Sequence, residues 1–226
     1  MQYRNTRRAV FIKRPNRFTA HVLLDGKEEI DHVKNTGRCK EILKKGANVI
    51  LERAENKNRK TKYSMITAYK NDLLINIDSQ VPNQVVAEAL AKGKFLKDTV
   101  LIKREFNYGN SRFDIYFENK KGKGLIEVKG VTLEDNGVAK FPDAPTERGT
   151  RHLREMIKAV EEGYSGYIFF LIQLKGAKYF TPNHSTDPLF ASTLSLARDK
   201  GVKILAYDCL ISEDSIELNN KIPVRL

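Results

Sequence analysis

One pair of alternating segments constrains the fold of this chain more than any other feature. Residues 111–118 read SRFDIYFE, residues 124–131 read GLIEVKGV, and the basic stretch NKKGKG leads from one to the other. Side chains alternate between the two faces of a strand, so apolar residues at every second position indicate that each segment packs one face on a core. Glycine and lysine between them suit a turn. The sequence therefore predicts two strands that pair as an antiparallel hairpin.

The opposite faces of these segments carry charged side chains. Asp114 shares a strand face with Arg112, while Glu127 and Lys129 share a face of the second strand. If the strands pair through the predicted turn, Asp114, Glu127 and Lys129 converge. Two carboxylates could hold Mg²⁺ or Mn²⁺ against a phosphate, and the lysine could orient or deprotonate the attacking water. This is the pattern of the D…(E/D)xK nucleases, and the alternative is a solvated strand face carrying a Glu/Lys pair.

A helix precedes the two strands. The segment VPNQVVAEALAKGKF predicts a helix over 84–92 with Val85, Ala89 and Leu90 on its buried side. Glu88 could project from this helix towards the strands as a further catalytic acid that binds a second ion or the attacking water. The alternative is an ordinary exposed glutamate on a helix.

The net charge of +12 is uneven along the 226 residues. Residues 1–80 hold 18 of the 40 Lys and Arg residues and 9 of the 28 Asp and Glu residues, so +9 of the +12 lies there. A basic segment of this kind indicates a polyanionic partner, and we favour DNA, duplex or single-stranded. The alternative is a generic basic surface.

The sequence indicates no membrane partner. No apolar run is long enough to span a bilayer, and the first residues, MQYRNTRRAV, lack the apolar core of a secretory signal. Cys39 and Cys209 are far apart and have no metal-binding spacing, which fits a reducing compartment. We therefore expect a cytoplasmic protein.

Residues 1–80 read as short β-runs separated by turns. Candidate strands are 17–24, 29–33, 47–53, 62–69 and 73–77, with one short helix at 39–44. Five strands with a small helical insertion predict an OB-like β-barrel, although other small barrels fit as well. Turn and helix-cap residue types at 78–83 mark a boundary, so the predicted domains are 1–80 and 81–226.

The second domain has longer elements. After helix 84–92 the pattern predicts strands near 99–107, 111–118 and 124–131, a loop at 132–149, helix 150–163, strand 166–173, helix 187–200 and strand 202–207. Strand 166–173 is apolar almost throughout, which indicates burial on both faces. The order α-β-β-β-α-β-α-β describes a mixed sheet with helices on its faces, as expected of a restriction-endonuclease-like (PD-(D/E)xK) α/β domain.

Several basic stretches are candidate nucleic-acid contacts, because basic side chains bind phosphates and aromatic rings stack on bases. Three lie in the first domain: FIKRPNRF, HVKNTGRCKE with Thr36, and ENKNRKTKY with Lys57. The loop FPDAPTERGTRH adds an arginine at a helix N-terminus, where a phosphate is favoured. A plain capping loop is the alternative, and we interpret His152 as a surface or capping residue. The candidate nucleic-acid-binding residues are Arg14, Arg17, Arg38, Lys60, Arg112 and Arg148.

Together these segments resemble the sugar fermentation stimulation protein A (SfsA) family. The pieces FIKRPNRF, HVKNTGR, NRKTKY, VPNQVVAEAL, YGNSRFDIYF, LIEVKGVTL and FPDAPTERGTRHL run in order across nearly the whole chain. The resemblance implies an N-terminal OB-like domain, a nuclease-related C-terminal domain, largely non-specific DNA binding and a regulatory role in sugar metabolism. By position it implies that Asp114, Glu127 and Lys129 match the nuclease triad, Glu88 the helical acid, and Arg14, Arg17 and Arg38 the basic motifs.

Three functions remain open from the sequence. The first is a DNA-binding protein that carries a nuclease-like metal site. The second is an active endo- or exonuclease that depends on Mg²⁺ or Mn²⁺. The third is a nuclease scaffold that serves as a platform for binding a protein or RNA.

Overall fold

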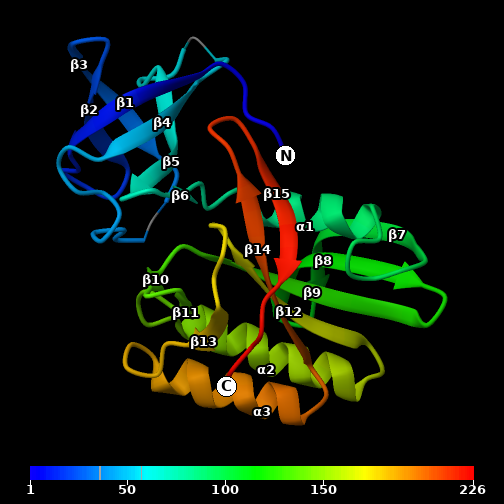
Figure 1. The fold of residues 1–226 in the computed structure, drawn as a ribbon. Coiled ribbons are helices and arrows are strands. Elements are labelled where there is room, and N and C mark those ends of the chain that lie inside the picture. The colour runs from blue at the N-terminus through cyan, green and yellow to red at the C-terminus, as the bar shows by residue number, and fades with distance from the viewer. Residues whose placement is uncertain (36, 57) are drawn as a thin grey trace. The chain divides into compact units, whose positions relative to one another are not determined.

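The computed structural model describes residues 1–35, 37–56 and 58–226. Thr36 and Lys57, which fall within two of the basic stretches, lie outside the described residues. The chain forms two compact units (Figure 1). The first comprises Met1–Val81, Gln173–Lys175 and Cys209–Glu217, and the second comprises Pro82–Ile172, Gly176–Asp208 and Leu218–Leu226. Among the described residues, no helix is both long and apolar enough to cross a membrane.

The first unit contains a closed five-stranded barrel of OB topology. Its strands are β1 (Thr6–Lys13), β2 (Thr19–Leu24), β3 (Lys27–Val33), β4 (Asn48–Arg53) and β5 (Tyr63–Lys70). β1 pairs antiparallel with both β2 and β4, β2 with β3, and β4 with β5. A short parallel pairing of β3 with β5 closes the barrel. Apolar side chains alternate inward along β2 and β1, which provides the barrel core. The predicted OB-like barrel is confirmed.

Three details of the barrel prediction are wrong. The first barrel strand, β1, was missed, and the predicted strand 73–77 is β6 (Leu73–Asn76), which pairs with β5 outside the closed barrel. The predicted helix 39–44 is a single turn, in which the amide of Leu43 donates to the carbonyl of Cys39 at 2.8 Å. Cys39 has a φ of +48°, in the left-handed region, which a right-handed helix does not allow, and the few residues that follow it are too short a segment to nucleate a helix.

The second unit is a mixed sheet with helices on both faces, as predicted. The strand order is β15-β14-β12-β9-β8-β7. The strands of this sheet are β7 (Thr99–Tyr108), β8 (Ser111–Asn119), β9 (Gly122–Val131), β12 (Ser165–Ile172), β14 (Lys203–Ile211) and β15 (Ile216–Lys221). The last three residues of β14 and the first two of β15 are counted with the first unit. β12 pairs in parallel with β9 and β14, while β7, β8 and β9 are antiparallel neighbours. All but the first residue of β12 is buried, which confirms that this strand is covered on both faces.

Three helices cover this sheet. α2 (Glu147–Glu161) and α3 (Pro188–Asp199) lie side by side on one face, and α1 (Pro82–Ala91) lies on the other (Figure 1). The predicted loop 132–149 is partly wrong, because it contains β10 (Glu134–Asp135) and β11 (Val138–Phe141), which form a small sheet with β13 (Tyr179–Pro182). Strands of two to four residues offer too few positions for an alternating pattern to show.

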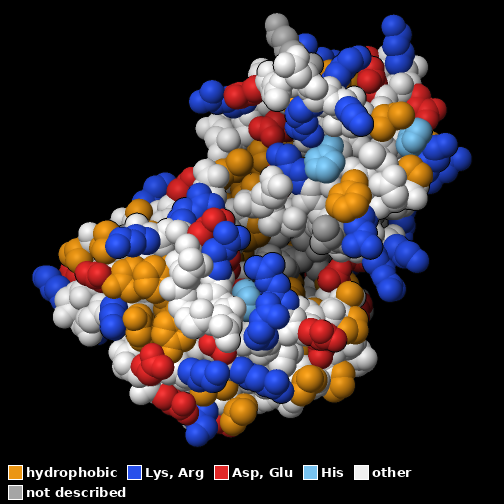
Figure 2. All heavy atoms as spheres, turned by 180° about the vertical axis from the view of Figure 1, so that it is seen from behind, with side chains coloured by type: hydrophobic (Ala, Val, Ile, Leu, Met, Phe, Trp, Pro, Cys, Tyr) orange, Lys and Arg blue, Asp and Glu red, His pale blue; other side chains and the backbone are white. Residues whose placement is uncertain are grey.

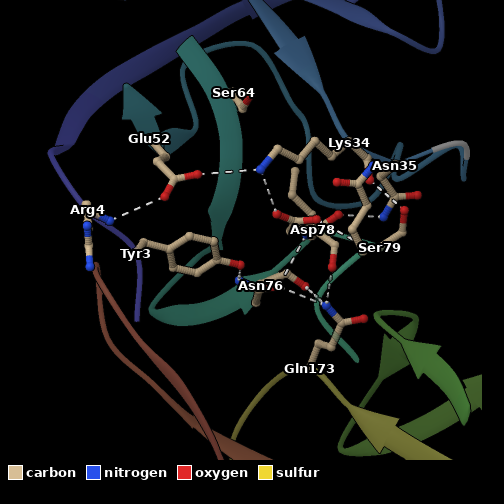
Figure 3. Close-up of polar contacts among 12 residues, drawn as sticks. Tyr3, Arg4, Lys34, Asn35, Glu52, Ser64, Asn76, Asp78, Ser79 and Gln173 are labelled. Carbon is tan, nitrogen blue, oxygen red and sulfur yellow. Dashed lines mark hydrogen bonds and ion pairs between the residues drawn. The ribbon is translucent and has the colours of Figure 1, made fainter. Parts of the chain in front are cut away.

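A polar network holds residues 76–78, which begin with the last residue of β6, against other parts of the first unit (Figure 3). Lys34 Nζ lies 3.2 Å from Asp78 Oδ2 and 3.5 Å from Glu52 Oε2. Gln173 Nε2 donates to Asn76 Oδ1 at 2.8 Å and to the carbonyls of Asn76 and Asp78 at 3.1 Å each. Because Gln173 is almost 100 residues away in the sequence, the barrel unit depends on a segment that follows β12.

Candidate functional site

The predicted hairpin is formed, and its charged residues lie where the regular pairing of β8 with β9 ends. Ile115 faces Ile126, and the hairpin closes through Asn119 and Gly122. Beyond the Ile115–Ile126 pair, Asp114 Oδ2 accepts a hydrogen bond from the backbone amide of Val128 at 2.7 Å. This bond holds the side chain of Asp114 against β9 at Val128, the residue between Glu127 and Lys129.

Helix α1 supplies the second hydrogen bond to Asp114. Asn83 Nδ2 donates to Asp114 Oδ1 at 2.7 Å. Asn83 was interpreted as a turn or cap residue at the domain boundary, and this is wrong, because α1 begins one residue earlier, at Pro82. Both Asp114 oxygens therefore accept hydrogen bonds, which orients the carboxylate while leaving further lone pairs for a ligand.

Glu127 is the most buried of the predicted site residues. It is 2% exposed, and its Oε1 accepts from Lys129 Nζ at 2.7 Å and from His152 Nδ1. Its other oxygen, Oε2, is buried and has no hydrogen-bond partner among the described residues. The Lys129 side chain is only 15% exposed. These values contradict the alternative that Glu127 and Lys129 form a solvated pair on an exposed strand face.

The charges of Glu127 and Lys129 both influence the ionisation of Asp114. Burial raises the pKa of Asp114 to about 6, and the negative charge of Glu127 contributes to the rise, while Lys129 acts in the opposite direction. Burial alone would raise the pKa of Glu127, but the charge of Lys129 and the hydrogen bond from His152 outweigh it and hold that pKa below its usual value. The site thus combines an ionised Glu127 with an Asp114 whose charge is disfavoured, an arrangement that a cation would stabilise.

The interpretation of His152 as a surface or capping residue is wrong. His152 is 3% exposed, bonds to Glu127 through Nδ1, and packs edge-on against the ring of Phe113, with the centroids 6.0 Å apart. Arg148 Nε lies 3.5 Å from the other ring nitrogen, Nε2. The available signal was the position of His152 beside Leu153 on the apolar face of an amphipathic helix, where a polar residue needs a partner.

Glu88 does not join the two carboxylates. Its Oε1 accepts from Gln84 Nε2 at 2.9 Å on the same helix. Within the part of the chain that the structure describes, no three His, Cys, Asp or Glu side chains gather closely enough to hold a metal ion. Asn83, more than one turn earlier on α1, is the helical residue that reaches Asp114. The site therefore has two carboxylates.

The predicted nucleic-acid-binding residues differ in their surroundings. Arg17, Arg38, Lys60, Arg112 and Arg148 are exposed. The guanidinium of Arg14 instead donates to four carbonyl groups, those of Arg17, Asn35, Gly37 and Arg38, at 2.5–3.0 Å. Arg17 lies 5.9 Å from the centroid of the Phe18 ring, which is 52% exposed. Figure 2 shows Lys and Arg side chains in several groups on one face of the molecule.

Comparisons with known proteins cover the whole chain. A family model described as "Sugar fermentation stimulation protein RE domain" matches residues 80–215, and one described as "SfsA N-terminal OB domain" matches residues 12–77. A sugar fermentation stimulation protein homolog from Clostridium beijerinckii is 54% identical over 226 residues, and the match covers 100% of this chain and 100% of the relative. A homolog from Clostridium botulinum strain Langeland is also 54% identical over 226 aligned positions, and the match covers 99% of this chain and 98% of the relative.

A solved structure has the same fold. It is described as Pyrococcus furiosus SfsA in complex with Ca²⁺, and it matches with a TM-score of 0.91 and 28% sequence identity over 100% of this chain and 98% of the other. The family models and the fold agree on an OB barrel followed by a nuclease-like α/β domain. The chain therefore belongs to the sugar fermentation stimulation protein (SfsA) family.

Proposed function

We propose that this protein binds DNA largely without sequence preference and holds Mg²⁺ or Mn²⁺ at Asp114 and Glu127. The observation that carries the proposal is the convergence of these carboxylates with Lys129, together with the buried Glu127 Oε2 that has no partner among the described residues. A cation would supply that partner and would counteract both the burial and the Glu127 charge that raise the pKa of Asp114. The Ca²⁺ complex of the Pyrococcus furiosus relative supports a divalent ion in this fold.

The donor set fits a hard divalent cation. Carboxylate oxygens are the protein ligands that Mg²⁺, Mn²⁺ and Ca²⁺ prefer, and Mg²⁺ commonly uses one or two carboxylates, with water and phosphate oxygens in the other positions. Asp114 and Glu127 would hold the ion, with the Val128 carbonyl as a further candidate ligand. When bound, such an ion polarises a phosphate oxygen and makes a bound water more acidic.

The charge on the first unit supports nucleic acid as the ligand. OB barrels bind single strands and other nucleic acids through basic grooves and stacking side chains. Arg17, Arg38 and Lys60 are exposed on this unit. Arg14 has its guanidinium on the backbone around Arg17 and Arg38, so we assign it the role of holding these two in place rather than contacting phosphate.

The first test is the salt dependence of DNA binding. The affinity for a duplex of random sequence should fall steeply as salt rises from about 50 to about 200 mM, because each neutralised phosphate adds about −0.9 to the slope of log K against log [salt]. Fluorescence anisotropy measures this slope. Arg17→Gln with Arg38→Gln should make the slope shallower by about 1.8. Arg4→Gln with Arg7→Gln is the matched control, since both arginines are already paired with Glu55 and Asp25. A salt-independent affinity would contradict the proposal.

Phosphodiester hydrolysis is a second candidate function, and the position of Lys129 favours it. Lys129 Nζ lies 2.7 Å from Glu127 Oε1, so the lysine is held beside the carboxylate proposed to bind the ion. An ammonium group at this point can orient a water molecule or offset the charge that develops on a phosphate during attack. His152 holds Glu127 from the opposite helix, α2, and so keeps the carboxylate oriented for both partners.

The second test separates ion binding from cleavage. Lys129→Met should lower cleavage by about 10²- to 10³-fold while Mn²⁺ still binds, because the lysine acts on the phosphate or water and is not a metal ligand. Glu127→Gln should lose both Mn²⁺ binding and cleavage. Calorimetry measures Mn²⁺ binding, and plasmid, linear duplex, single-stranded DNA and RNA are offered as substrates with each metal.

Two outcomes would decide against cleavage. Activity that persists unchanged in both variants would assign it to a contaminant. A wild-type protein that binds Mn²⁺ and DNA but leaves every substrate intact would contradict the nuclease proposal while supporting the first. A regulatory role in sugar metabolism and a cytoplasmic location, both expected from the sequence, remain predictions.

A further inference from the structure

The solvent face of α2 is a row of cationic side chains. Arg148, Arg151, Arg154 and Lys158 are exposed, while the opposite face of the same helix buries His152, Leu153 and Met156 among other side chains. Helix positions three or four apart are surface neighbours, about 5–6 Å between Cβ atoms. The cations therefore follow one another along the helix.

Most of this charge is not neutralised by the protein. Lys158 Nζ lies 3.0 Å from Glu155 Oε1. Arg151 and Arg154, by contrast, have no carboxylate within salt-bridge distance anywhere in residues 1–35, 37–56 and 58–226. Like charges at this spacing destabilise a helix slightly. A row of arginines without carboxylate partners is therefore slightly unfavourable until an anion binds to it.

The row begins at the candidate metal site. Arg148 Nε lies 3.5 Å from His152 Nε2, and His152 Nδ1 bonds to Glu127. The helix thus presents arginines to solvent on one side and orients a site carboxylate on the other. From Arg148 to Arg154 the helix rises about 9 Å. One strand of B-DNA presents two or three phosphates over that length, at about 3.4 Å along the axis for each nucleotide.

The N-terminal end of the helix is fixed in place. Thr146 Oγ1 accepts from the amide of Gly149 at 3.0 Å, and the amide of Thr146 donates to Asp187 Oδ2 at 2.8 Å. Asp187 is also the N-cap of α3, where its Oδ1 accepts from the amide of Phe190. A helix held at its first turn and packed along its buried face presents its arginines without an ordering cost for the backbone.

We propose that this face of α2 is a phosphate track, on which Arg151 and Arg154 contact successive backbone phosphates of one nucleic-acid strand as it leaves the Asp114–Glu127–Lys129 site. The inference rests on the proposed DNA binding and adds the place and direction of the strand. Planar guanidinium groups suit phosphate oxygens because they donate two parallel hydrogen bonds. Backbone contacts of this kind carry no sequence preference.

The test removes two charges from the track and compares the result with the removal of two charges at the C-terminal end of α3. In the full-length protein, Arg151→Gln with Arg154→Gln is set against Arg198→Gln with Lys200→Gln at the end of α3. Arg198 and Lys200 are exposed but already paired, with Asp199 at 2.9 Å and Glu161 at 4.0 Å. Binding of a labelled random-sequence duplex and of a labelled single strand is measured by anisotropy at several salt concentrations.

The track variant should bind at least about tenfold more weakly at about 0.1 M salt, and its salt slope should be shallower by about 1.8 on duplex or about 1.4 on single-stranded DNA. The α3 variant should stay within about twofold of wild type, and Mn²⁺ binding should be unchanged in both, because neither pair touches Glu127. If the track and α3 variants bind alike while wild type keeps a steep salt slope, the track is wrong and the proposed DNA binding stands. If wild type shows no salt-dependent binding, the proposed function fails first.

Discussion

Replacing Lys34 with methionine should lower the free energy of unfolding by about 3–5 kcal/mol. Lys34 Nζ lies between the carboxylates of Asp78 and Glu52 (Figure 3), and the Asp78 side chain is 1% exposed. Burial already raises the pKa of Asp78, and Lys34 is the main influence in the opposite direction. Without the lysine, Asp78 would be a buried charge with no cation beside it, which is far more costly than losing an exposed ion pair.

Matched variants distinguish the cost of leaving Asp78 as an unpaired buried charge from the smaller cost of losing an ion pair on the surface. Lys34→Met combined with Asp78→Asn should recover much of the lost stability, because the buried charge is gone. Lys62→Met is the control, since Lys62 is paired with Glu29 at 3.6 Å but is 73% exposed, and it should cost less than about 1 kcal/mol. Urea unfolding at pH 7, followed by circular dichroism, gives the four values. Equal losses for Lys34→Met and Lys62→Met would contradict the argument.

The same network shows which parts of the fold a sequence can and cannot reveal. The barrel strands β2 to β5 and the β8–β9 hairpin follow from local alternation, and the convergence of Asp114 with Glu127 follows from strand geometry, whereas β1 was missed. The bond from Gln173 to Asn76 joins residues 97 positions apart, and no local pattern encodes it. The participation of Gln173–Lys175 in the barrel unit is therefore visible only in three dimensions.

The candidate site also contains residues that the sequence reveals and residues that it does not. Its two carboxylates and its lysine were predictable because they lie on adjacent strands joined by a short turn. Asn83 and His152 were misread because they reach the site from helices, 31 and 25 residues away from their partners. Arg14 was predicted as a phosphate contact from its basic surroundings, but a sequence pattern does not show whether an arginine meets solvent or backbone carbonyls.

Asp31 is a second buried acid whose replacement should change the stability of the protein strongly. It lies on β3, is fully buried, and neither of its carboxylate oxygens has a hydrogen-bond partner among the described residues. Burial raises its pKa from 3.8 to about 7. Between these two values the folded protein binds more protons than the unfolded chain, so stability decreases as pH rises through this window. Above about pH 7 the full penalty is present, on the order of 4 kcal/mol at about 1.36 kcal/mol for each pKa unit.

Asp31→Asn should therefore stabilise the protein at pH 8 by several kcal/mol while changing its stability little near pH 4, because the amide is neutral at both and the native carboxyl is neutral only at the lower pH. Thermal and urea unfolding at both pH values measure the difference between the two proteins. Asp72→Asn, on the exposed turn between β5 and β6, is the control and should change stability little at either pH. If Asp31→Asn and wild type lose stability in parallel as pH rises, the Asp31 carboxyl has a partner or water contact that keeps it ionised inside the barrel, and the argument from its burial is wrong.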